Sequence, residues 1–171
     1  MRGGPPSGKF ETFDDKAWQQ AIETSFLSHV RLIRAALPYL RKSISPSVLA
    51  VTSYSVKQPI PNLILSNSVR LATVGLIKTL ALELGSENIR FNSILPGSTE
   101  TERISHLITD RADASGTSLE EERARMIEEI PLGRIGTTEE FANAAVFLLS
   151  PAASFITGVM LAVDGGTIKS T

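Results

Sequence analysis

Three polar residues in the first half of the chain have types and positions suited to chemistry. Ser53 directly follows the short, apolar and β-prone segment 47–52, so its hydroxyl is expected at the end of a buried strand. Ser66 and Arg70 are four residues apart in a segment with helical periodicity, which places them on one helix face. The guanidinium of Arg70 can bind a ribose hydroxyl, a phosphate or a carboxylate. Structural interpretations stay open: a serine hydroxyl can satisfy loop backbone, and Arg70 can pair with an acidic neighbour.

The composition excludes several other kinds of site. The chain of 171 residues has no cysteine and carries a formal net charge of -1. Disulfides, thiolate catalysis and cysteine-ligated zinc are therefore excluded, and His29 and His106 are too few for a histidine-only metal site. Scattered Lys and Arg argue against a nucleic-acid surface or a basic membrane stripe. No stretch approaches the roughly 20 apolar residues of a membrane span, so we expect a soluble, cytoplasmic protein without nucleic-acid or membrane partners.

The first half of the chain predicts two long helices around one strand. Asp14 and Asp15 are N-cap candidates for a helix that reaches about Lys42 with one apolar face, and Pro38 is expected to kink its end. Segment 47–52 is the strand. The second helix, over about 63–84, is apolar almost all round, which indicates that it is covered on several sides.

The second half of the chain predicts two further strands, over 88–95 and 158–163. Polar residues 110–117 predict a mobile loop with short helix around it. Ser118 with Glu121, and Thr137 with Glu140, have capping-box spacing before helices. Strands that alternate with helices imply parallel βαβ units and an α/β layer fold. Three such strands look like part of a larger sheet, because parallel strands normally have both faces covered and neighbours on each side.

An ordered series of segments runs along the whole chain. The helix around Trp18 comes first. It is followed by the segments VLAVTS (48–53), LIKTLALEL (76–84), IRFNSILPG (89–97), IPLGRIG (130–136), ITG (156–158) and VDGG (163–166). In its order, and nearly in its spacing, this series resembles the short-chain dehydrogenases/reductases, and in particular members that are similar to 3-oxoacyl-acyl-carrier-protein reductases. The resemblance covers essentially the whole chain and depends on the series rather than on one motif.

The resemblance implies the C-terminal part of a doubly wound Rossmann-type sheet, as a single incomplete domain over 1–171. In the family, NAD or NADP lies along the carboxyl ends of the strands, at the topological switch point. Gly3 resembles the end of the family's turn after the fourth strand, so we expect that the earlier strands and the pyrophosphate-binding turn are absent. We therefore expect this chain alone to bind dinucleotide weakly or not at all, with no dissociation constant tighter than about 10 μM.

The resemblance also implies candidate site residues. In the family, a strand-end serine holds the substrate oxygen, and Ser53 matches it. A tyrosine transfers the proton, and a lysine four residues later lowers its pKa and holds the ribose; Ser66 and Arg70 occupy these positions. A serine is a far poorer proton donor than a phenol, and an arginine cannot relay a proton. Ser25 stands at the position of the family's asparagine. The loop with Pro96, Gly97 and Thr101 matches the one that meets the nicotinamide.

These departures leave two functions open. One is hydride transfer between NAD or NADP and a small-molecule carbonyl or alcohol, including reduction of a 3-oxoacyl thioester, with activity in this chain impaired. Tyr54, next to Ser53, is a candidate substitute for the missing phenol. The other is a non-catalytic fold remnant or an interaction module. Family members pair through the two long helices, which implies a homodimer or homotetramer through residues 17–42 and 63–84.

Overall fold

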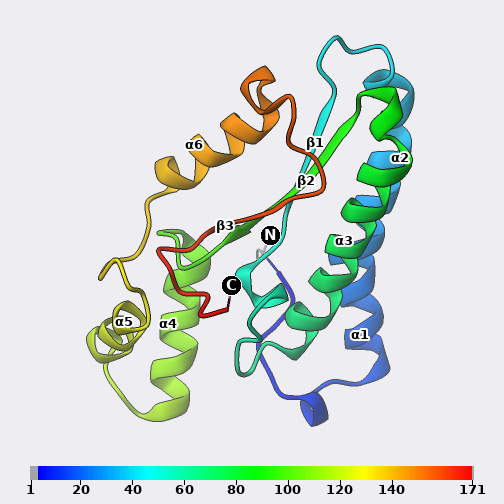
Figure 1. Ribbon diagram of the computed structural model, residues 1–171. Helices are drawn as coiled ribbons and strands as arrows, with labels where there is room; N and C mark the ends of the chain where they lie inside the picture. Colours follow the sequence, from blue (N-terminus) through cyan, green and yellow to red (C-terminus); the bar gives the residue numbers. More distant parts are fainter. Residues whose placement is uncertain (1–3, 171) are drawn as a thin grey trace.

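The fold is built on a three-stranded parallel sheet in the computed structural model, which describes residues 4–170 (Figure 1). The strands are β1 (Ser47–Val51), β2 (Arg90–Pro96) and β3 (Met160–Val163), in the order β1-β2-β3. Ser47 pairs with Arg90 at one end, and Pro96 pairs with Val163 at the other. The predicted parallel α/β arrangement is confirmed, with strand ends that differ by one or two residues from the expected ones.

The two long helices cover one face of this sheet, side by side (Figure 1). The first is continuous through α1 (Asp15–Ile22), a π-helical turn η2 (Glu23–Leu27) and α2 (Ser28–Leu40); the second is α3 (Ile64–Glu83). Asp14 is the N-cap, as predicted, and its carboxylate accepts from the Ala17 amide at 2.9 Å. Burial of apolar side chains holds the layers together, through a core of Ile33, Ala50, Ile77, Ala81, Ile89 and Phe91.

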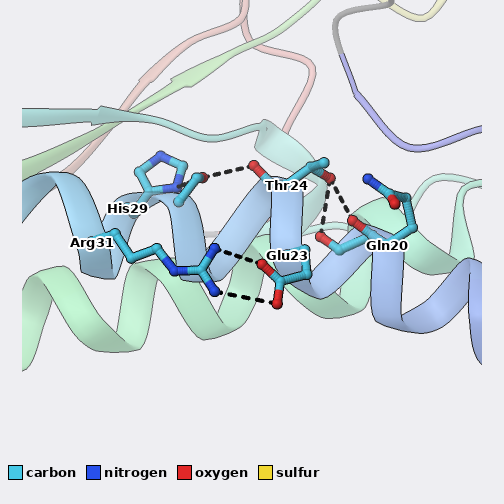
Figure 2. Close-up of polar contacts among 7 residues, drawn as sticks. Gln20, Glu23, Thr24, His29 and Arg31 are labelled. Atoms are coloured by element: carbon cyan, nitrogen blue, oxygen red, sulfur yellow. Dashed lines mark hydrogen bonds and ion pairs between the residues drawn. The ribbon is translucent and has the colours of Figure 1, made fainter.

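The π-helical turn has identifiable causes in side-chain hydrogen bonds (Figure 2). Thr24 Oγ1 donates to the Gln20 carbonyl at 2.8 Å, and Ser28 Oγ donates to the Thr24 carbonyl at 2.7 Å. Such bonds to the preceding turn compete with the regular backbone ladder. The Ser25 carbonyl instead accepts from Thr73 Oγ1 of α3 at 2.8 Å, where both residues are buried. The turn is therefore hydrogen-bonded to the second helix.

The opposite face of the sheet carries α6 (Thr138–Leu149), and α4 (Glu102–Ser115) and α5 (Leu119–Glu128) lie near the carboxyl ends of the strands (Figure 1). Both predicted capping boxes, at Ser118 and Thr137, are present. Within residues 4–170, no helix combines the length and the hydropathy that a membrane span requires.

The prediction of a mobile loop over residues 110–117 was wrong. Helix α4 continues through Ser115 and ends at Gly116, which adopts a left-handed conformation. Ile104, Ile108 and Ala112 are buried at a spacing of four, and Ile104 and Ile108 pack against Met126 of α5. This apolar stripe outweighs the polar composition of the segment, because burial against α5 stabilises the helix.

Candidate functional site

The carboxyl ends of the strands surround a pocket of about 480 Å³. Six of the candidate residues that the sequence suggested line this pocket. They are Ser53, Ser66, Arg70, Pro96, Gly97 and Thr101. Gly3 lies outside the described residues. Segments far apart in the sequence therefore meet at one site, as the parallel arrangement of strands predicts, because the carboxyl ends of parallel strands lie at one edge.

Ser53 begins the short turn η3 (Tyr54–Val56) immediately after β1. Its Oγ accepts a hydrogen bond from the Ser55 amide at 3.1 Å. The hydroxyl oxygen of Ser53 therefore satisfies an amide of the loop backbone, as one of the two interpretations of this serine expects. The bond uses a lone pair of the oxygen, however, so the hydroxyl hydrogen can still be donated into the pocket.

Ser66 and Arg70 are joined on one face of α3. Arg70 Nε donates to Ser66 Oγ at 3.1 Å, and Nη1 donates to the Thr52 carbonyl at 2.9 Å. The guanidinium is thereby fixed against the end of β1. Burial lowers the pKa of Arg70, and the nearby positive charge of Arg103 lowers it further. The Ser66 oxygen accepts from Arg70, so its hydrogen is also available to a ligand.

The loop after β2 is held from two directions. The Gly97 amide donates to the Val163 carbonyl at 2.9 Å, which attaches the loop to β3. The Gly136 amide donates to the Ser98 carbonyl at 3.0 Å, which attaches it to the segment before α6. Thr101 Oγ1 donates to the Thr99 carbonyl at 3.2 Å. The Thr101 hydroxyl therefore reinforces the loop within the pocket wall.

Ser25 does not line this pocket. It lies in the π-helical turn and borders a second cavity, together with His29 and Arg70. Burial lowers the pKa of His29, and the charge of Arg70 lowers it further, which favours the neutral imidazole. His106 is exposed and belongs to α4.

Sequence reasoning missed two arginines and an apolar wall. Arg103 and Arg111 of α4 line the pocket. The apolar wall comes from α4, α5 and α6, through Ile104, Leu107, Met126 and Phe141. The signal was present in the sequence: Arg103, Leu107 and Arg111 are four residues apart and share one face of a helix.

Tyr54 also lines the pocket, next to Ser53. Burial raises the pKa of its phenol, and the charge of Glu129 adds to this effect. The phenol is therefore protonated at neutral pH and can donate a hydrogen bond, although the raised pKa makes it a weaker acid.

The donors in this pocket fit the nicotinamide end of a dinucleotide. Arg70 is suited to ribose oxygens, and the backbone amides of Ser98 and Thr99 are suited to a carboxamide. A metal ion has no equivalent set, because residues 4–170 contain no group of three His, Asp or Glu side chains that could hold one.

Comparison with known proteins agrees with this geometry. Residues 3–167 match the family model described as Enoyl-(Acyl carrier protein) reductase. The 7alpha-hydroxysteroid dehydrogenase of Escherichia coli is 30% identical over 167 residues, which cover 98% of this chain and 60% of that protein. The 3-oxoacyl-acyl-carrier-protein reductase FabG of Chlamydia muridarum is 32% identical over 152 residues, which cover 89% of this chain and 57% of that protein.

The chain belongs to the short-chain dehydrogenase/reductase family. The NADPH-bound structure of a short-chain oxidoreductase from Pseudomonas aeruginosa PAO1 has a TM-score of 0.86 and 28% identity, and the match covers 99% of this chain and 64% of that one. That protein is described as containing an atypical catalytic centre. The chain thus spans about 60% of the length of the curated dehydrogenase above, and its fold is the family's Rossmann-type α/β fold.

Proposed function

We propose that this short-chain dehydrogenase/reductase transfers hydride between NAD or NADP and a small-molecule carbonyl or alcohol. The observation that carries the proposal is the convergence of Ser53, Ser66, Arg70 and the Gly97 loop on one pocket at the carboxyl edge of the sheet. Ligands of open α/β sheets bind at this edge. The names of the relatives, a hydroxysteroid dehydrogenase and a 3-oxoacyl reductase, support the reaction class.

Within this proposal, Ser53 and Ser66 bind the reacting oxygen. The hydroxyl oxygen of Ser53 accepts a hydrogen bond from the Ser55 amide, and the hydroxyl oxygen of Ser66 accepts one from Arg70 Nε. Each hydroxyl therefore donates its hydrogen to the substrate oxygen and stabilises the negative charge that develops there during reduction. When bound, the nicotinamide supplies or accepts the hydride. Arg70 contributes a fixed positive charge beside the site.

The proton for the reduced oxygen requires another group. Serine hydroxyls are weak acids, and Arg70 cannot relay a proton. Tyr54 is the phenol that lines the pocket, and its raised pKa keeps it protonated at neutral pH. We assign proton donation in the reductive direction to Tyr54. The Pseudomonas relative is likewise described as containing an atypical catalytic centre.

Ser53→Ala is expected to lower the rate of carbonyl reduction at least about 100-fold, because one donor to the developing oxyanion is lost. The assay follows oxidation of NADH and of NADPH with acetoacetyl-coenzyme A, which represents 3-oxoacyl thioesters, and with a cyclic ketone. Ser86→Ala is the matched control, since Ser86 is exposed in η4 (Gly85–Glu87), beyond the opposite end of α3. Equal rates in the two variants, or no turnover by the unmodified chain, would contradict the proposal.

An exposed apolar surface favours a second role in self-association. Leu32 and Tyr39 of α2 are 70% and 75% exposed, and Leu71 and Leu82 of α3 are 53% and 76% exposed. Large apolar side chains on adjacent helices mark interaction surfaces when they form a patch. We propose that α2 and α3 pair with the same helices of a second copy. Sedimentation velocity is expected to show a dimer or a tetramer, and a monomer at micromolar concentration would refute the pairing.

A further inference from the structure

Arginine side chains without acidic partners gather in the site pocket. Arg70, Arg103 and Arg111 line it, and none of the described lining residues is acidic. Within residues 4–170 these three form no ion pair, whereas five other arginines each pair with a glutamate: Arg31, Arg41, Arg123, Arg125 and Arg134. Clefts lined by one sign of charge attract ligands of the opposite sign. The pocket is therefore suited to an anion.

The three arginines do not occupy one point. Arg103, Leu107 and Arg111 follow one another at intervals of four along α4, so the two arginines are about 12 Å apart along the helix axis. Arg103 lies toward the start of the described chain, where its Nη2 donates to the Pro5 carbonyl at 3.3 Å. Arg111 also lines the adjacent cavity, which Tyr54 shares. The pocket thus has a positive group at each end and apolar Leu107 between them.

The two ends have different neighbours. A Cβ atom at Gly4 would lie 3.2 Å from Arg70 Nη2, and Arg103 donates to the carbonyl of the adjacent residue, Pro5, so these two guanidiniums lie near each other at one end of the pocket. Arg111 and Tyr54 line both this pocket and the adjacent cavity. Arg111 therefore lies near the residue that follows Ser53. It is the arginine placed to contact the part of a substrate that extends away from the reacting carbon.

Nearby carboxylates form no ion pair with Arg111 in the described part of the chain. Glu122 lines the adjacent cavity, but its Oε1 accepts from Arg125 at 2.6 Å and from Thr117 at 2.8 Å. Glu129 lines the same cavity, and no ion pair joins it to Arg111 in the described part of the chain. The guanidinium of Arg111 keeps its donors for a ligand.

We propose that the substrate carries a carboxylate that Arg111 binds, with Leu107 and Met126 packed against the apolar part of the molecule. The inference rests on the proposed oxidoreductase function for one point only, the location of the reacting carbonyl or alcohol at Ser53. Arg111 acts as a specificity residue, because a guanidinium binds a carboxylate through two parallel hydrogen bonds. The apolar walls account for the remaining contacts.

Calorimetric titration of the chain with octanoate and with octanamide tests this inference without cofactor or turnover. Octanoate is expected to bind about tenfold more tightly than the neutral amide. Arg111→Gln is expected to weaken octanoate about tenfold, which corresponds to about 1.4 kcal/mol, and to leave octanamide unchanged. Arg111→Lys keeps the positive charge but cannot form two parallel hydrogen bonds to a carboxylate. This variant is expected to lose an intermediate amount of octanoate affinity. Arg34→Gln, on an exposed position of α2, is the matched control.

Several outcomes would overturn the inference. They are equal affinity for the two probes, failure of octanoate to bind at a few millimolar, and a loss that follows Arg103→Gln rather than Arg111→Gln. Displacement of octanoate by inorganic pyrophosphate, together with that last pattern, would assign the positive charge to cofactor phosphates instead. A failed turnover assay with intact octanoate binding would defeat the proposed reaction alone, so the two failures are distinguishable.

Discussion

Gly97→Val is expected to lower the free energy of unfolding by about 2 to 3 kcal/mol, as overpacking of a close contact does. A Cβ atom at Gly97 would lie 2.6 Å from Asp164 Cα and 2.7 Å from Asp164 Cβ. The segments that contain Gly97 and Asp164 cannot separate freely, because the Gly97 amide donates to the Val163 carbonyl at 2.9 Å. The clash therefore displaces the loop that forms one wall of the pocket, and the proposed activity is expected to fall with stability.

Urea denaturation followed by circular dichroism measures this change. Gly85→Ala is the matched control, because Gly85 has no positive φ and a Cβ added there would meet nothing within 4 Å. That variant is expected to be as stable as the unmodified chain or slightly more stable. If Gly97→Val unfolds at the same urea concentration as Gly85→Ala, the close approach of the two loops is wrong.

Arg90→Met is expected to cost at least about 3 kcal/mol of unfolding free energy, since hydrogen bonds to a charged group contribute about 1.5 to 3 kcal/mol each. Arg90 is 7% exposed at the start of β2 and has no acidic partner within residues 4–170. Its Nη1 donates to the Leu148 carbonyl at 2.7 Å, and Nη2 donates to the carbonyls of Leu149 and Ser150 at 3.2 and 3.1 Å. These carbonyls lie at the C-terminal end of α6, where the helix dipole favours a positive charge.

The same denaturation measurement tests this role. Methionine retains the apolar stem but leaves the three carbonyls without Arg90 as a donor. Arg34→Met is the control, since Arg34 is exposed on α2, and its effect is expected to stay within about 0.5 kcal/mol. A loss no larger than that of the control would show that Arg90 does not anchor α6 to the sheet.

Local patterns in the sequence were sufficient to predict most of the helices and strands that form the layers. Residues 47–52 combine apolar, β-prone side chains with flanking turns, and the strand forms there. The capping boxes at Ser118 and Thr137 also depend on a spacing of three residues, which can be read directly. These features were predictable because neighbours in the sequence determine them.

Features that depend on distant partners were not predictable in this way. The π-helical turn involves the hydroxyl of Thr73, 48 residues after Ser25. Arg90 was recognised only as part of a strand, because its carbonyl partners are about 60 residues away. The error over residues 110–117 differs in kind, since the buried spacing of Ile104, Ile108 and Ala112 was available but polar composition was given more weight.

The candidate site shows the same division. Ser53, Ser66 and Arg70 could be placed from the family resemblance, and all three line the pocket. The hydrogen bond from Arg70 to Ser66 could not be predicted, because it depends on the directions of the two side chains. The presence of three arginines in the pocket could not be predicted either, because two of them come from α4. The roles of these residues in catalysis stay predictions.

Titration with nicotinamide mononucleotide, followed by amide chemical shifts in nitrogen–proton spectra, tests the central claim most directly. This molecule is the half of the cofactor that the pocket is proposed to hold. The account predicts saturable shifts at the amides of Ser53, Arg70 and Gly97, with Ser86 unaffected. No shifts at millimolar concentration, or shifts confined to α6 and β3, would contradict a nicotinamide site at the carboxyl ends of the strands.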